Sequence, residues 1–148
     1  LDHLLSERGF NNQGHGWDSA LRTLMKVRQT KVREIELVIF QPTKAERISD
    51  LFVNSEPSVY AHRGLVPASL FELMAPIPSQ FNWKARKQFF AQFGTRFFII
   101  IHGHFTEGAF GRAFPWIGMN RIGVVELQVG AGLITDPQSV WYAGFRTL

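Results

Sequence analysis

The sequence contains no cysteine. A disulfide framework, a thiolate zinc site and a cysteine nucleophile are therefore all excluded. The absence indicates nothing about the cellular compartment, because a domain of this size can fold without disulfides in any location. Stability and chemistry must both come from the other side chains.

Long hydrophobic runs are missing as well. The longest apolar stretch runs from Phe97 to Ile101 and has the length of a strand. A helix that crosses a bilayer needs about 20 consecutive apolar residues. We therefore expect no insertion into a membrane.

Tyrosine is scarce, with 2 residues against 14 phenylalanines in a chain of 148 residues. Phenylalanine has no polar atom to satisfy, so most of its rings should lie in a core or at a dry interface. The chain is 45% hydrophobic and 19% charged, which is typical of a folded protein and excludes a disordered one. Its length suits a single domain, residues 1–148.

Acidic residues are few in the second half of the chain, and the net charge of +4 arises there. Residues 1–74 contain nine Lys or Arg and nine Asp or Glu, whereas residues 75–148 contain seven and three. Such an asymmetry is typical of a surface that binds phosphate or another polyanion. Ordinary surface charge is the alternative interpretation.

The first half of the chain reads mainly as helices and loops. Residues 1–16 include a polar, glycine-rich segment from residue 6 that predicts a loop or a flexible start. A helix should begin at Asp18 or Ser19, and alternation of apolar and acidic residues over 34–40 favours a strand. A capping-box pattern predicts a short helix over about 44–53. Pro67 suits the first turn of another that ends near Met74.

The second half changes to the period of strands. Asn82 can cap a helix over Trp83 to Phe93, which Gly94 would end. Strands are expected over 95–105, 121–129 and 138–146, with a glycine-rich connection over 106–120. These elements predict an α+β fold: a single domain in which helices pack on a largely antiparallel sheet formed mainly by the C-terminal half.

A basic, aromatic segment runs from Phe81 to Phe90. Cations beside exposed rings suit nucleic acid, because the cations bind phosphates and the rings stack on bases. An amphipathic helix with buried rings and solvated cations would give the same pattern. A second group of aromatic and basic residues, in the glycine-rich connection over 106–120, would also suit contact with a protein partner. The candidate binding residues are Trp83, Lys84, Arg86, Lys87, Arg112, Trp116 and Arg121.

The segment His102-Gly103-His104 is the strongest candidate for chemistry. Residues i and i+2 of a strand point to the same side, so both imidazoles could bind one metal ion. Glu107 follows in the expected loop and could supply a carboxylate ligand or a base, and Tyr142 a nucleophile. Gly103 would allow a ligand or backbone to approach closely.

Known histidine patterns match this segment only in part. HUH endonucleases have a hydrophobic residue between two histidines, where this chain has Gly103. JAMM metalloproteases have an aspartate ligand shortly after the pair, whereas the first aspartate after His104 is Asp136. No family follows from these residues.

Two functions from different classes remain. The first is a non-enzymatic interaction domain, which binds a polyanion such as nucleic acid or forms part of a larger protein assembly. The second is a hydrolase, a phosphodiesterase or nuclease, with a divalent metal such as Zn or Mn at His102, His104 and Glu107.

Overall fold

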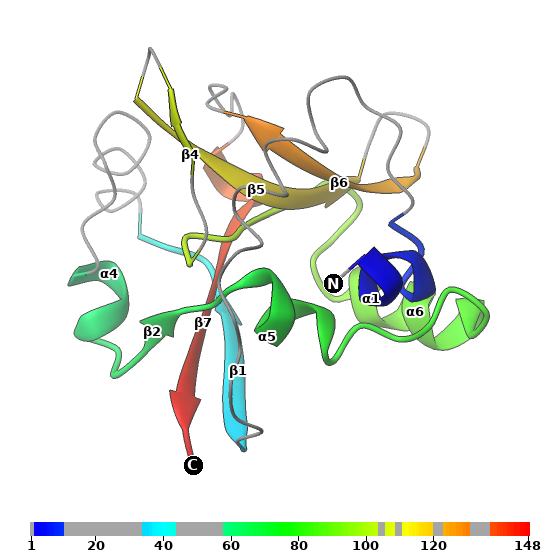
Figure 1. The fold of residues 1–148 in the computed structure, drawn as a ribbon, viewed down its shortest axis with the longest axis horizontal. Coiled ribbons are helices and arrows are strands. Elements are labelled where there is room, and N and C mark those ends of the chain that lie inside the picture. The colour runs from blue at the N-terminus through cyan, green and yellow to red at the C-terminus, as the bar shows by residue number, and fades with distance from the viewer. Residues whose placement is uncertain are drawn as a thin grey trace.

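The computed structural model describes residues 2–10, 34–43, 58–103, 106–108, 111–119, 123–130 and 137–148. Within these ranges, helices combine with a mostly antiparallel sheet whose strands lie mainly in the C-terminal half, so the α+β class is confirmed (Figure 1). The helices expected from Asp18 and over 44–53 fall outside the described residues. No helix in the described ranges is long and apolar enough to cross a membrane.

The described helices are α1 (Asp2–Glu7), α4 (Ser58–Ala61), α5 (Leu70–Met74) and α6 (Trp83–Ala91). The strands are β1 (Ile35–Phe40), β2 (Val66–Pro67), β3 (Phe98–Ile100), β4 (Thr106–Gly108), β5 (Gly111–Met119), β6 (Val125–Gly130) and β7 (Val140–Thr147). A short 3₁₀ turn, Pro137–Ser139, leads into β7. The strand order is β1-β7-β3-β5-β4, while β2 pairs with β7 and β6 with β5.

Strand β7 has neighbours on both edges. Along one edge it pairs antiparallel with the whole of β1, from Ile35 opposite Thr147 to Phe40 opposite Tyr142. Along the other edge its first half pairs with β3 and its second half with β2. The pairing of β3 with β7 is parallel, so the expectation of mutually antiparallel strands is wrong for this pair. β3 also runs in the same direction as β6, since both pair antiparallel with β5.

The expected connection over 106–120 is wrong, because these residues contain β4 and β5. Proline in a strand removes a ladder hydrogen bond, yet Pro115 lies within β5. The Ile101 N–H donates to the Pro115 carbonyl at 3.0 Å. The return bond of that residue pair would need an N–H that proline lacks. An N–H at Pro115 would point toward Ile101, just after the end of β3, so its absence breaks no bond within the β3–β5 ladder.

The strand expected over 95–105 is shorter in the structure, and in the described part of that range only β3 is a strand. Both β3 and β4 pair with β5, β3 with its C-terminal part and β4 with its N-terminal part. Between them the chain turns away, and the Gly103 N–H donates to the Ala68 carbonyl at 3.0 Å. A Cβ atom at Gly103 would lie 2.3 Å from that same oxygen. Glycine is therefore needed for close approach of another backbone segment.

The helix α6 follows the sequence prediction closely. The Asn82 side chain accepts a hydrogen bond from the Ala85 N–H at 3.4 Å, as expected of a capping residue. Gly94 follows the helix with φ +92°, a left-handed conformation that glycine adopts without strain. The helix ends at Ala91, two residues before the expected end.

The start of α5 differs from the expectation. Pro67 belongs to β2, and the helix begins at Leu70. The Ser69 N–H donates to Oε2 of Glu72 at 3.1 Å, one half of a capping box. The short helix α4 precedes β2 in the chain.

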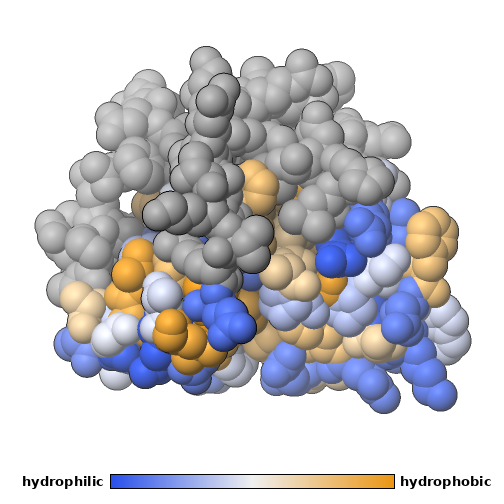
Figure 2. All heavy atoms as spheres, turned by 60° about the horizontal axis from the view of Figure 1, so that its bottom comes forward, coloured by the Kyte–Doolittle hydropathy of each residue, from blue (hydrophilic) through white to orange (hydrophobic). Residues whose placement is uncertain are grey.

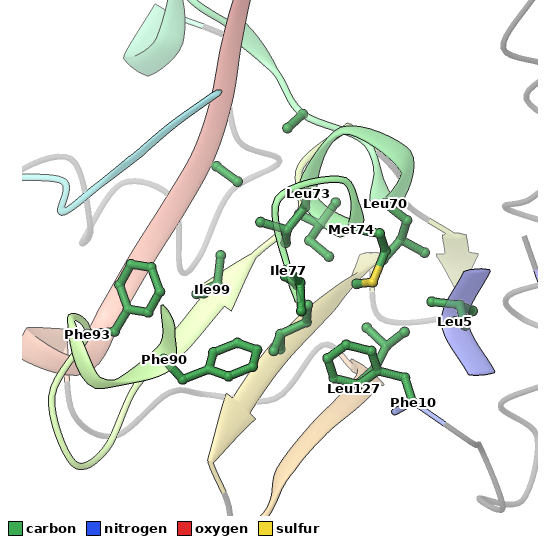
Figure 3. Packing of buried hydrophobic residues seen from close by; sticks show 14 of the residues in the cluster. Leu5, Phe10, Leu70, Leu73, Met74, Ile77, Phe90, Phe93, Ile99 and Leu127 are labelled. Atoms are coloured by element: carbon green, nitrogen blue, oxygen red, sulfur yellow. The ribbon is translucent and has the colours of Figure 1, made fainter. Parts of the chain in front are cut away.

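The larger core cluster combines side chains from α1, α5, α6, β3 and β6 (Figure 3). Its buried members are Leu5, Phe10, Ala68, Leu70, Leu73, Met74, Ile77, Phe90, Phe93, Phe97, Ile99, Ile101, Ile117, Leu127, Ala143 and Phe145. The spacing of apolar residues predicts six core residues, Phe89, Phe93, Phe97, Ile99, Ile101 and Leu127. Five of them belong to the cluster, and Phe89 packs against it while partly exposed.

A smaller cluster consists of Val59, Tyr60, Leu65, Ile100, Val140 and Tyr142. Neighbouring residues of β1 contribute to the two clusters in turn: Leu37 and Ile39 to the larger, Val38 and Phe40 to the smaller. Because successive side chains of a strand point to opposite faces, the two clusters lie on opposite faces of the sheet.

Phe97→Ala should lower the free energy of unfolding by about 3–5 kcal/mol, the range for truncating a buried aromatic ring. Phe97 is fully buried and its ring stacks on that of Phe90, with centroids 5.7 Å apart. Phe81→Ala is a matched control, because the Phe81 side chain is 84% exposed. The control should change stability by less than about 0.5 kcal/mol. Equal losses for both variants in urea unfolding would contradict this core.

Candidate functional site

The outward face of α6 brings aromatic and basic side chains together. Lys87 lies beside both Trp83 and Lys84 on the helix, because residues three and four positions apart are neighbours on its surface. All three are exposed, Trp83 to 69%. Phe90, two turns further along the helix, is buried. The sequence expectation of exposed cations is met at Lys84 and Lys87.

The second exposed ring of this region is Phe81, which precedes the helix. Its N–H donates to Oγ of Ser79 at 3.3 Å, and the next residue, Asn82, caps α6. The backbone that carries Phe81 and Trp83 is thus held by local hydrogen bonds. We name the group Phe81, Trp83, Lys84 and Lys87 the α6 surface. The prediction from sequence omitted Phe81, although its place in the same basic, aromatic segment was a usable signal.

Arg86 does not join this surface, although it was expected on the outer face. Its guanidinium carbon lies 5.2 Å from the centroid of the Phe10 ring and 5.1 Å from that of Phe90. Its Nε–H donates to the Arg8 carbonyl at 3.1 Å. Partial burial lowers the pKa of Arg86 from its usual value. This side chain therefore connects the N-terminal segment to α6.

The other candidate binding residues lie in different surroundings. Trp116 belongs to β5, is half-buried and packs edge-on against Phe98 with ring centroids 5.3 Å apart. Phe114 and Trp116 both pack against the smaller cluster, so the exposed aromatic loop expected here is wrong. Arg112 also lies in β5, but its side chain is outside the described part, as is the whole of Arg121.

Hydrophobic side chains on the face turned forward in Figure 2 are separated by hydrophilic ones. The described surface in this view has no single continuous apolar area. Exposed large apolar residues of the described chain are Val66, Phe81, Trp83, Val124 and Leu148. Phe81 and Trp83 are close neighbours in sequence and combine exposure with adjacent lysines.

His102 lies in the turn that follows β3, not in a strand as expected. Its imidazole is enclosed by rings: the centroid of Tyr142 lies 4.5 Å away, that of Phe114 4.8 Å and that of Tyr60 5.5 Å. The Tyr60 hydroxyl and Nδ1 of His102 form a hydrogen bond. Both tyrosines of the chain therefore contact this one histidine. Their scarcity was a signal that the sequence interpretation did not use.

Burial lowers the pKa of His102 from 6.5 to about 3. The charged imidazolium would lose its hydration among these rings, so the neutral form is favoured. A neutral imidazole is the form that binds metal ions. Because Nδ1 is bonded to Tyr60, Nε2 is the ring nitrogen that could bind a metal ion.

The rest of the expected metal site is only partly described. Glu107 lies in β4 opposite Arg112 rather than in a loop, and its side chain is outside the described part, as is His104. Tyr142 lies in β7, within the strand expected over 138–146, and its side chain is fully buried. No group of three His, Asp or Glu residues that could hold a metal occurs among the described residues.

Comparison with known proteins gives no relative: no family model, curated protein or solved structure matches this chain. Functional inference therefore rests on the residues themselves.

His102 should make stability depend on pH. Between its folded pKa of about 3 and its unfolded value of 6.5, only the unfolded chain binds this proton. The contribution is therefore complete above about pH 6.5 and is lost, by up to about 1.4 kcal/mol per pH unit, as the pH falls toward 3. His102→Gln cannot titrate and should remove this part of the dependence.

Urea unfolding of the unmodified protein and of His102→Gln, at about pH 7 and about pH 5, measures how much the free energy of unfolding of each depends on pH. His62→Gln is the control for the substitution of a histidine by glutamine, because His62 is exposed. Identical pH profiles for His102→Gln and the unmodified chain would show that the imidazole is hydrated.

Proposed function

We propose that this chain is a non-enzymatic interaction domain whose α6 surface binds a polyanion, specifically single-stranded nucleic acid. The observation that supports the proposal is the exposure of Phe81 and Trp83, 84% and 69%, beside two exposed lysines. Rings that serve only a core would be buried, as Phe90, Phe93 and Phe97 are in the same part of the chain.

The chemistry of this surface suits an unpaired strand. Aromatic side chains stack on bases irrespective of sequence, at about 1–3 kcal/mol for each base, and lysines bind the phosphates between them. The bases of a duplex are already stacked on each other, so exposed rings favour the single strand. The excess of seven cations over three acids in residues 75–148, which include α6, adds long-range attraction.

Trp83→Ala and Lys87→Glu test the two components separately. Trp83→Ala should weaken the binding of a single-stranded oligonucleotide about 5- to 100-fold and leave its salt dependence unchanged, because stacking involves no counterion. Lys87→Glu should weaken binding and lower the slope of log K against log salt by about one unit. Fluorescence anisotropy at several salt concentrations gives both quantities.

Arg146→Glu is the control for net charge, since it changes the charge by the same amount as Lys87→Glu. Arg146 lies near the end of β7, away from α6 in Figure 1, and its Nε–H lies 3.1 Å from Glu36 Oε2. It should weaken binding much less than Lys87→Glu. Equal effects would show that net charge alone attracts the ligand. No binding even at low salt would leave the protein-assembly version of the interaction domain.

A metal-dependent hydrolase centred on His102 is the second candidate. The hydrogen bond between Tyr60 and Nδ1 of His102 supports it, because ligand histidines in metal sites are usually oriented in this way through their other nitrogen. His104 and Glu107 would complete the ligand set, with Tyr142 adjacent to the histidine.

Metal analysis of protein purified without chelator tests this candidate directly. A hydrolase should contain about one Zn or Mn per chain, and the His102→Ala, His104→Ala double variant should lose both the metal and any phosphodiesterase activity. A metal content near zero, with activity unchanged in the double variant, would remove the hydrolase hypothesis while leaving the nucleic-acid proposal intact.

A further inference from the structure

Strand β1 has the composition of an interior strand but lies at an edge. Its hydrophobic residues contribute to the larger cluster on one face and the smaller cluster on the other. Apolar residues on both faces are typical of a strand with neighbours on both sides. Among the described strands, however, β1 pairs with β7 alone, and each of its apolar side chains is only partly buried.

The backbone of β1 presents donors and acceptors along its other edge. The Leu148 N–H donates to the Glu34 carbonyl at 3.2 Å, which continues the ladder between β1 and β7 by one residue. In an antiparallel ladder, alternate residues direct both polar groups to the same neighbour. Glu36, Val38 and Phe40 therefore face β7. The N–H and carbonyl groups of Ile35, Leu37 and Ile39 point the opposite way.

Features that usually protect an edge strand are missing from β1. Natural edges carry lysine, proline or a bulge, which prevent pairing with another chain. The segment Ile35–Phe40 contains neither of these residues, and it pairs with β7 residue by residue without a bulge. Its one charged residue, Glu36, forms an ion pair with Arg146 within the sheet.

We propose that β1 of one copy pairs antiparallel with β1 of a second copy about a two-fold axis. The ladder can form only if residues whose N–H and carbonyl groups point outward in one copy lie opposite residues of the same kind in the other copy. One such register centres on Glu36 and would place two carboxylates directly opposite, which is unfavourable. The register centred on Val38 instead places Leu37 opposite the partner's Ile39 and Val38 opposite the partner's Val38. Every residue of β1 then has an apolar or uncharged polar neighbour across the new ladder.

An apolar groove beside β1 supports the same partner. It has a volume of about 250 Å³, and its lining includes Leu37, Ile39, Phe89, Phe93 and Trp141. In the two-fold arrangement the same face of both sheets lies on the same side, so the partner's Leu37 and Ile39 extend this apolar wall. The groove and the edge are thus covered by one partner, and the sheet becomes continuous through both copies.

The mass of the full chain in solution tests the pairing, by light scattering after gel filtration over a range of concentrations. We expect a dimer, and a shift to the monomer for Leu37→Pro. The Leu37 N–H faces outward, so proline there removes no hydrogen bond to β7, and circular dichroism should remain that of the unmodified chain. A monomer at every concentration would overturn the proposal.

Cysteine cross-linking tests the register without relying on a proline variant, and the chain has no other cysteine to interfere. Val38→Cys places two thiols at a directly opposed pair, where Cβ atoms about 4.5–5.5 Å apart are close to disulfide geometry. Mild oxidation should convert most of this variant to a covalent dimer. Leu148→Cys is the control, at a side chain 76% exposed just after the end of β7. Cross-linking of Val38→Cys no faster than this control would contradict the two-fold pairing.

Discussion

The pairing of β7 on both of its edges is the constraint on which the other elements depend. β1 hydrogen-bonds along its whole length to β7, and β2 and β3 share the opposite edge. The side chains of β7 supply both clusters, since Ala143 and Phe145 face one and Val140 and Tyr142 the other. Loss of this strand would therefore separate β1 from the rest of the sheet and expose both layers of side chains at once.

Local patterns in the sequence predicted the elements that local interactions determine. The capped start of α6, its termination at Gly94 and the alternating strand β1 each follow from neighbouring residues. The strand β5 could not be predicted in this way. Its proline is tolerated because the strand beside it is interrupted at that point, and the interruption in turn needs Ala68 to approach Gly103. That arrangement exists only in the folded chain.

In the candidate sites, too, neighbouring residues determine some features and distant parts of the chain determine others. Helical spacing predicted that Lys84 and Lys87 face solvent, and both are exposed. Arg86 differs because Phe10 and the Arg8 carbonyl reach it from the N-terminal segment, a contact that spacing within the helix does not contain. The surroundings of His102 were likewise hidden, since Tyr60 and Tyr142 come from two distant parts of the chain.

The position of β7 in the chain also has a consequence for synthesis on the ribosome. Ile35 pairs with Thr147, so β1 emerges long before the strand that completes its ladder. During that interval its apolar residues have no sheet to join, and contacts so far apart in sequence form slowly because a long loop must close first. The nascent chain therefore presents an unpaired, hydrophobic strand of the kind that chaperones bind and that aggregates when they are scarce.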